Sequence, residues 1–273
     1  MSKNYAICGG KIGKCAIEKT KTSRRGRKMS ITKRQEQIME LLGEEGYATV
    51  ERLAELTYTS PSSIRRDLAS LQNLSMLKRT HGGASLLNSA GQPIPLYSRM
   101  TRNISEKRKI AKSAAALLSD GMTVMLDGSS TAGFLVPYIA KHKDMIVFTN
   151  NMLTAINSIN YGITTHCIGG EAVNHSAVNS GPQAYIAADA VTPDILFFSS
   201  QSLDREGNIS DPIAEENYIR TIMLKRAKRK IFLCDSEKFG TSSLYRLANV
   251  EEIDACVFDK PYPELEVGAK IIY

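Results

Sequence analysis

A fifteen-residue segment that begins at Ser60 carries a helical pattern of apolar and polar positions. Ser60 can cap a helix, and Pro61 suits the first helical position because its φ is preset and no donor is needed there. At 100° per residue, Ile64, Leu68 and Leu71 fall on one stripe. Small, polar and cationic residues occupy the other side, namely Ser62, Ser63, Arg65, Arg66, Ala69 and Ser70. The pattern predicts a helix with a core face and a basic face.

Two further helical patterns precede this segment, and a hairpin pattern follows it. Residues 32–45 place apolar side chains on one face and are followed by Gly46, a common stop signal. Thr49 can cap a second, shorter helix. In residues 77–87 the pair Gly82-Gly83 permits the positive φ values of a tight hairpin. Three short helices followed by a hairpin predict a winged helix-turn-helix.

Beyond residue 104 short apolar runs alternate with helical patterns. Helices are expected at residues 106–118 and 132–140. Strands are expected at residues 122–126, 145–149, 164–168, 195–198, 230–234 and 255–258, with a short last strand at 269–272. Apolar runs that alternate with helices in this way indicate an α/β domain whose parallel sheet is covered on both faces.

The composition supports a folded protein with an uneven charge. The 273 residues are 42% hydrophobic, which is enough for one large or two moderate domains with their own cores. Residues 1–87 hold 16 basic and 8 acidic side chains, whereas residues 88–273 hold 19 and 20. All of the excess positive charge is therefore N-terminal. This suits a polyanion-binding module joined to a domain with another task.

Domain boundaries follow from the pattern and the composition. Residues 1–28 are basic, have no hydrophobic period and are expected to form a disordered arm. The winged helix-turn-helix is assigned to residues 29–87. Residues 88–104 contain two prolines and a glycine without a helical stripe, which predicts a linker. The α/β domain is assigned to residues 105–273.

Cysteine usage and hydropathy indicate a soluble, cytoplasmic protein. Cys167, Cys234 and Cys256 lie in apolar strand-like runs, where a thiol behaves as a small buried hydrophobe. Cys8 and Cys15 have no second pair of ligands nearby, so we expect no metal site. No apolar run approaches the length of a membrane span. Nothing in the sequence calls for a cofactor.

The basic face of the helix that begins at Ser60 is the candidate DNA-binding surface. Ser62 and Ser63 allow a close approach to the major groove, with Arg65 and Arg66 in reach of phosphates or guanine edges. The hairpin adds three side chains that would face a phosphate backbone, namely Lys78, Arg79 and His81. An ordinary amphipathic helix fits this segment alone equally well, but the neighbouring helices and the hairpin favour double-stranded DNA. Because one recognition helix reads only a short half-site, a homo-oligomer is expected.

The candidate ligand site lies beyond the strand ends, where parallel sheets bind ligands. The strand at 122–126 is followed by Asp127-Gly128-Ser129-Ser130-Thr131, and small hydroxyl residues at a helix start suit a phosphate. Other strands end in Asn150-Asn151, in Gly169-Gly170 and in Asp235-Ser236, with Lys238 close behind. Each could be only a capped helix start or a surface ion pair. Four polar strand ends together favour a polar pocket.

Several motifs resemble the DeoR/GlpR family of bacterial transcriptional regulators. They are SSIRRDL at residues 62–68, LKRTHGGA at residues 77–84 and, further on, LDGSST, VFTNN, CIGGE and CDSEKFG. The resemblance implies a winged helix-turn-helix and an α/β effector domain related in fold to ribose-5-phosphate isomerase and glucosamine-6-phosphate deaminase. It also implies that Arg65 and Arg66 lie on the recognition helix and that His81 lies in the turn of the wing.

The resemblance further implies a phosphorylated sugar as ligand, and hence a repressor of a sugar-metabolism operon. Residues 127–131 would surround the phosphate, with Asn150, Gly170 and Lys238 lining the pocket. This chain departs from the family pattern at several places, including Ser63 in place of threonine and Ser129-Ser130-Thr131 in place of Gly-Thr-Thr. Tyr58 stands where glycine or asparagine is usual in the turn, and side chains at 199–202 stand where the family tends toward glycine.

A second hypothesis is a sugar-phosphate isomerase or deaminase with an appended nucleic-acid-binding module. Such chemistry needs a carboxylate positioned as general base, and Asp204, Glu215 and Glu216 are available. Nothing in the sequence pairs them with a dedicated acid, and an enzyme has no need of a winged helix. The regulator, without catalytic residues, is therefore the leading hypothesis.

Overall fold

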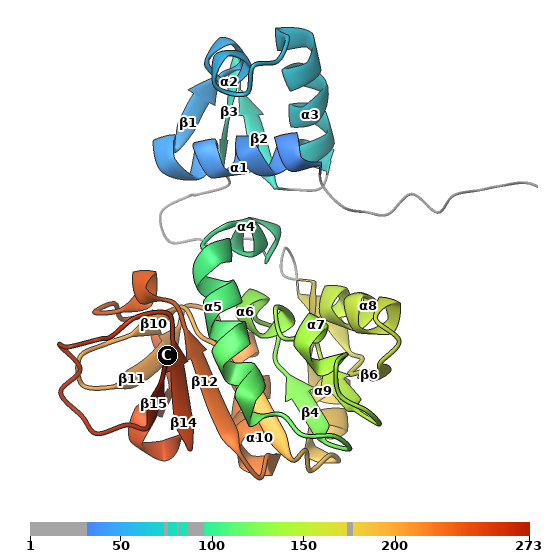
Figure 1. Ribbon diagram of the computed structural model, residues 1–273, viewed down its shortest axis with the longest axis vertical. Helices are drawn as coiled ribbons and strands as arrows, with labels where there is room; N and C mark the ends of the chain where they lie inside the picture. The colour runs from blue at the N-terminus through green and yellow to red at the C-terminus, as the bar shows by residue number, and fades with distance from the viewer. Residues whose placement is uncertain (1–31, 74–75, 81, 87–95, 174–176) are drawn as a thin grey trace, which may run out of the picture. The chain divides into compact units, whose positions relative to one another are not determined.

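A computed structural model describes residues 32–73, 76–80, 82–86, 96–173 and 177–273 (Figure 1). The predicted arm of residues 1–28 and His81 of the predicted wing lie outside these residues. Among the described residues no helix is both long and apolar enough to cross a membrane.

The N-terminal part is a winged helix-turn-helix, as predicted. It consists of α1 (Lys33–Glu45), β1 (Tyr47–Thr49), α2 (Val50–Leu56), α3 (Pro61–Asn73), β2 (Leu77–Thr80) and β3 (Gly83–Leu86). The three strands form an antiparallel sheet in the order β1-β3-β2. Thr49 caps α2 by accepting a hydrogen bond from the Arg52 backbone N–H at 3.1 Å. Strand β1 was not predicted because three residues are too few to show a period.

The turn between α2 and α3 keeps a left-handed residue even though Tyr58 occupies it. Tyr58 has φ 50° and is 96% exposed. Its backbone N–H donates to the carbonyl of Glu55 at 3.1 Å, and that of Thr59 donates to Ala54 at 2.9 Å. Since φ > 0 costs a residue with a Cβ about 1–2 kcal/mol, the turn bears strain that glycine would avoid.

The two wing glycines serve different purposes, which corrects the prediction that both supply positive φ. Gly82 has φ 82° and supplies the turn. Gly83 does not adopt a positive φ, and a Cβ built on it would lie 2.4 Å from the carbonyl oxygen of Ala48 on β1. Gly83 is therefore needed for the close approach of β1 to β3.

The C-terminal part is built on a seven-stranded parallel sheet, which confirms the predicted class. The order is β15-β14-β12-β9-β4-β5-β6. The strands are β4 (Thr123–Leu126), β5 (Ile146–Thr149), β6 (Thr164–Cys167), β9 (Ile195–Phe198), β12 (Lys230–Cys234), β14 (Ala255–Phe258) and β15 (Ile271–Ile272). All seven runs predicted as strands are present, with bounds that differ by one or two residues at most.

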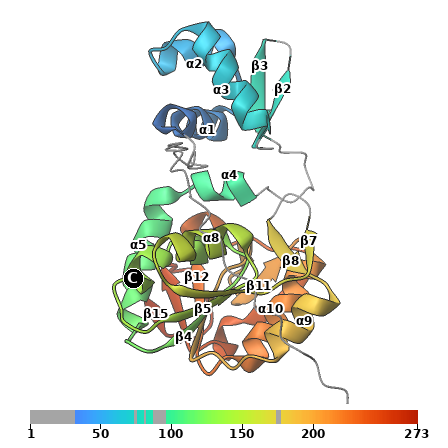
Figure 2. The same cartoon turned by 90° about the vertical axis from the view of Figure 1, so that its right-hand side faces the viewer.

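Helices cover both faces of this sheet (Figures 1 and 2). One face packs against α5 (Ile104–Ala114) and α7 (Val136–Ile139), and the other against α9 (Pro182–Asp189) and α10 (Ala214–Arg226). Other helices of this part are α6 (Ser130–Gly133), α8 (Met152–Asn160), η1 (Ala115–Leu117), η2 (Ser236–Lys238) and η3 (Val250–Glu252). The alternating residues of the central strands thus enter two separate cores.

Two predictions about helices are wrong. The linker predicted over residues 88–104 contains α4 (Leu96–Thr101), and α5 begins within it at Ile104. Leu96 is fully buried, so this segment packs instead of connecting freely. The single helix predicted at 132–140 is divided into α6 and α7, because Pro137 lacks the N–H that a continuous helix would use.

Short antiparallel strands complete the domain and were not predicted. Strands β7 (Glu171–Val173) and β8 (Val178–Ser180) pair with each other, while β10 (Ser202–Leu203), β11 (Asn208–Asp211) and β13 (Tyr245–Asn249) form a three-stranded sheet. Strands of two to five residues with mixed polarity leave little periodic signal. They matter because β11 carries Asp211 to the functional site.

Candidate functional site

Helix α3 exposes the basic face that the sequence predicts. Ile64, Leu68 and Leu71 are fully buried, whereas Arg65 and Arg66 are exposed. The Arg66 guanidinium donates to the Ser63 hydroxyl at 3.5 Å and to the Ser62 carbonyl at 3.4 Å. The hydroxyl of Ser60 donates to that of Ser63 at 3.0 Å. Ser60, Ser62, Ser63 and Arg66 thus form one hydrogen-bonded group at the start of the helix.

The wing adds cations. On β2 Leu77 is buried, while Lys78 and Arg79 are exposed. The Arg65 guanidinium lies 3.6 Å from the Glu51 carboxylate of α2, and both side chains are more than half exposed. A surface pair of this kind is weak, so a phosphate or a base edge can replace the carboxylate.

An ion pair between α1 and α3 was missed in the sequence. Arg34 Nε donates to the Asp67 carboxylate at 2.5 Å, and Gln35 donates to the same carboxylate at 3.4 Å. The hydrogen bond and the charge of Asp67 raise the pKa of Arg34. Asp67 lies on the buried side of α3 and fixes that helix against α1. The apolar pattern of α3 could not indicate this ion pair, because an aspartate on the buried face of the helix only interrupts the pattern.

A cavity of about 200 Å³ lies in the α/β domain beyond the strand ends. Four of the eight predicted ligand residues line it, namely Ser129, Ser130, Thr131 and Lys238. The side chains that the sequence did not indicate come from the α4–α5 segment, from the loop after β9, from β11 and from α10. They include Arg99, Arg102, Asn103, Lys107, Gln201, Asp211 and Arg220. The cations Arg99, Arg102 and Lys107 were the available signal, but the two arginines fell in the predicted linker and Lys107 in the helix predicted after it.

The other four predicted ligand residues do not line this cavity, which corrects the prediction for them. Asp127 is fully buried and bonded to other side chains. A Cβ atom added to Gly128 would lie 2.7 Å from the Val178 side chain, and one added to Gly170 would lie 2.4 Å from the Ser180 carbonyl oxygen. Both glycines are therefore packed against β8. Asn150 donates to the Asn179 carbonyl at 3.0 Å. Gly128, Gly170 and Asn150 support the packing of β8 beside the strand ends.

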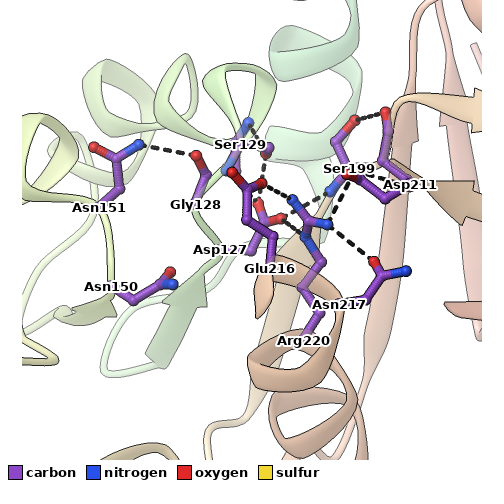
Figure 3. Close-up of polar contacts among 12 residues, drawn as sticks. Asp127, Gly128, Ser129, Asn150, Asn151, Ser199, Asp211, Glu216, Asn217 and Arg220 are labelled. Carbon is purple, nitrogen blue, oxygen red and sulfur yellow. Dashed lines mark hydrogen bonds and ion pairs between the residues drawn. The ribbon is translucent and has the colours of Figure 1, made fainter. Parts of the chain in front are cut away.

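A buried arginine organises the floor of the cavity (Figure 3). Arg220 of α10 donates to Asp127 at 2.8 Å, to Asp211 at 3.1 Å and to Glu216 at 2.8 Å. Burial alone would lower the pKa of Arg220, but the three carboxylates raise it above its ordinary value. Asp127 also accepts from the Ser129 hydroxyl at 2.5 Å. The network thereby connects α10 to the start of α6.

Lys107 of α5 ties the α4–α5 segment to the cavity. Its ammonium donates to the carbonyl of Arg99 and, at 2.6 Å, to that of Arg102. Burial lowers the pKa of Lys107 to about 7; the charges of Lys238, Arg99 and Arg102 also lower it, and that of Asp235 raises it. A buried ammonium held by carbonyls in a cationic wall favours an anionic ligand.

Lys238 belongs to a second polar group on the cavity wall. Its ammonium lies 2.9 Å from the Asp235 carboxylate and donates to the Ser199 hydroxyl at 3.0 Å. Asp235 also accepts from Asn103 at 2.9 Å. Burial would raise the pKa of Asp235, but Lys238, Lys107 and Asn103 lower it. A carboxylate held ionised in this way can accept hydrogen bonds from ligand hydroxyl groups.

Several buried polar atoms on the cavity wall have no hydrogen-bond partner among the described residues. On the cavity wall they are Arg99 Nε, Gln201 Nε2 and Thr131 Oγ1. Arg99 Nη2 also lacks a hydrogen bond but lies 3.7 Å from Oε1 of the buried Glu216, which does not line the cavity. Buried polar groups without partners are costly. Their presence on one cavity wall indicates a site built for a polar ligand.

The carboxylates considered for enzymatic chemistry do not line the cavity. Asp204 accepts from the backbone N–H of Asn208 at 2.7 Å and does not line the cavity. Glu215 is exposed, and Glu216 is bonded to Arg220. None of the three is a free carboxylate in the cavity.

Comparison with known proteins covers both parts of the chain. Residues 34–90 match the model of a DeoR-like helix-turn-helix domain, and residues 102–260 match that of a DeoR C-terminal sensor domain. The transcriptional regulator GolR of Listeria innocua is 32% identical over 227 residues, which are 83% of this chain and 89% of GolR. The glycerol-3-phosphate regulon repressor of Escherichia coli is 25% identical over 236 residues, 86% of this chain and 93% of the repressor.

Solved structures similar to this chain include ribose 5-phosphate isomerase A of Methanocaldococcus jannaschii. The similarity covers 50% of this chain and 55% of the isomerase, with 17% identity and a TM-score of 0.38.

Proposed function

The chain belongs to the DeoR family of transcriptional regulators, and from that premise we propose a repressor of a sugar-metabolism operon that a phosphorylated sugar releases from its operator. As a member of this family it is a DNA-binding regulator and not an enzyme. The observation that carries the ligand part of the proposal is that three buried polar groups on the cavity wall, Arg99 Nε, Gln201 Nε2 and Thr131 Oγ1, have no hydrogen-bond partner among the described residues.

The DNA part of the proposal rests on α3 and the wing. The major groove and its flanking phosphates would be contacted by Ser60, Ser62, Ser63, Arg65 and Arg66. The adjacent phosphate backbone would be contacted by Lys78 and Arg79 of the wing. The ion pair of Arg65 with Glu51 supports this assignment. Because the pair is exposed and weak, the Arg65 guanidinium can leave it for DNA with little loss of free energy. His81, outside the described residues, is proposed as a further contact of the wing.

The ligand part rests on the two kinds of side chain in the cavity. Arg99, Arg102, Lys107 and Lys238 offer charge-assisted donors to a phosphate. Asp235 offers acceptors to sugar hydroxyls. A cavity of about 200 Å³ has room for a small phosphosugar rather than for a nucleotide-sized ligand.

Regulation then follows from linkage. Arg99 and Arg102 belong to the segment that follows the DNA-binding domain in sequence, and their present partners are Glu216 at 3.7 Å and Glu237 at 3.6 Å. A ligand phosphate would compete with these carboxylates for the two arginines. If the ligand-bound state presents the winged helices less favourably, operator affinity falls by the coupling free energy.

Selection from random DNA duplexes followed by fluorescence anisotropy tests the proposal. The selected duplex should bind at nanomolar protein concentration, and one member of a panel of phosphorylated sugars should weaken that binding, while the unphosphorylated sugar should not. Failure of every phosphosugar to change DNA binding or the melting temperature would contradict the ligand assignment. Isomerase or deaminase turnover without DNA binding would favour the enzyme instead.

A further inference from the structure

One stretch of the α/β domain lacks charged side chains. Residues 145–170 contain no Asp, Glu, Lys or Arg, although these residues make up 23% of the chain. About six would be expected in a stretch of this length at average usage. The stretch includes β5 inside the sheet, but also α8 and β6, which have exposed faces. Burial therefore does not account for the missing charge.

Helix α8 exposes large apolar side chains. Its inner face is formed by Ala155 and Ser158, which are buried. On the outside Ile156 is 56% exposed and Ile159 is 61% exposed, and Tyr161, directly after the helix, is 50% exposed. The two isoleucines are three residues apart, so they lie on one side of the helix. An exposed apolar cluster of this kind marks an interaction surface.

Strand β6 lies beside α8 and forms the end of the seven-stranded sheet (Figure 1). Within the described residues it pairs only with β5. Thr164, His166 and Cys167 are exposed. Proteins usually protect such an edge with lysine, proline or a bulge, and β6 has none of these.

The same face of the sheet carries charge elsewhere. Helix α5 packs on that face and exposes Arg108, Lys109 and Lys112 to solvent. The uncharged area is thus confined to the α8–β6 surface, defined here as Ile156, Ile159, Tyr161 and the strand Thr164–Cys167.

We propose that the α8–β6 surface is the interface through which two copies of this chain form a dimer. A second copy fits because an uncharged surface meets its own copy without like-charge repulsion. The free edge of β6 can also pair with itself antiparallel about a two-fold axis. Such an arrangement would extend the sheet across both subunits while the isoleucines of the two α8 helices pack together.

Sedimentation equilibrium of the full chain and of two charge variants tests the interface. Ile159→Glu buries a carboxylate in the proposed interface, and Ile156→Lys does the same with an ammonium. Ile186→Glu is the matched control, because Ile186 is 72% exposed on α9, outside this surface. The parent chain and the control should be dimers at micromolar concentration. Both interface variants should dissociate at least tenfold more readily with unchanged circular dichroism.

Two outcomes overturn the proposal. A monomeric parent chain would mean that this surface meets something other than a second copy. A parent dimer that both variants retain would place the interface elsewhere.

Discussion

At the scale of single residues, the cavity depends on side chains whose roles cannot be read from pattern. Ser129, Ser130 and Thr131 follow a strand and were found from that position alone. Arg99 and Lys107 reach the cavity only because α4 folds back, as the Lys107 hydrogen bond to the Arg99 carbonyl shows. Asp127 was found for the wrong reason, since it pairs with Arg220, which lies 93 residues further along the chain. The end of a strand can be recognised from neighbouring residues in the sequence, whereas a pair such as Asp127 and Arg220 forms only when the chain folds.

Arg65→Ala tests the recognition helix. The side chain is 57% exposed and has only a weak pair with Glu51, so unfolding free energy should change by less than about 1 kcal/mol. Operator affinity should fall by about 1–3 kcal/mol, as expected for loss of an arginine contact to a base. Fluorescence anisotropy measures it, with Arg246→Ala as the control for charge. Equal operator affinity in the Arg65 variant would contradict the assignment.

Ser130→Glu tests the phosphate position. Ser130 is buried on the cavity wall, and a carboxylate there would repel the phosphate dianion. The sugar-phosphate concentration that releases operator should rise at least about tenfold, equivalent to roughly 1.4 kcal/mol, while DNA binding persists. Ser130→Gln has the same size without the charge and should have a smaller effect. Equal effects of Glu and Gln would mean that bulk rather than charge is responsible.

Lys107 should make stability depend on pH. The unfolded chain keeps this proton up to its ordinary pKa of 10.5, whereas the folded protein releases it at about 7. The unfolded state binds more protons between these values, so the Lys107 contribution to stability rises with pH, by at most about 1.4 kcal/mol per unit. Urea unfolding from pH 6 to 9 should show the difference between the parent and Lys107→Met increasing above pH 7. The exposed Lys112→Met should show no such trend; parallel curves for Lys107→Met would refute the proton linkage.

At the scale of elements, segments with a strong local pattern were predicted well, whereas most short strands and the 13-residue helix α10 were not. The helix at Ser60 and the seven strand runs have strong patterns that tertiary packing reinforces. β1 and β10 have two or three residues, and α4 has six. Their positions are set by partners distant in sequence, such as β3 for β1, so no local pattern could specify them.

Tyr58 gives an element-scale prediction for the turn between α2 and α3. Asparagine tolerates the left-handed conformation, and the 96% exposed tyrosine has no packing to lose. Tyr58→Asn should therefore stabilise the winged helix-turn-helix by about 0.5–1 kcal/mol, measured by thermal unfolding. Tyr58→Ala gains no such conformational preference and should not stabilise. Stabilisation by alanine equal to that by asparagine would mean that the strain is absent.

At the scale of the whole molecule, a DNA-binding domain and a ligand cavity share one chain, and their coupling has a thermodynamic consequence. Whatever path connects them, ligand and operator must affect each other's binding equally. The first ratio is the Kd for operator in the presence of ligand divided by the Kd in its absence. The second is the Kd for ligand in the presence of operator divided by the Kd in its absence. The two ratios should be equal, typically about 5 to 150. Anisotropy gives the first ratio and calorimetric titration of the protein–operator complex gives the second. Arg99→Gln removes the competition with Glu216 and should bring both ratios closer to one together. Ratios that differ beyond error would exclude a single coupled equilibrium between the two sites.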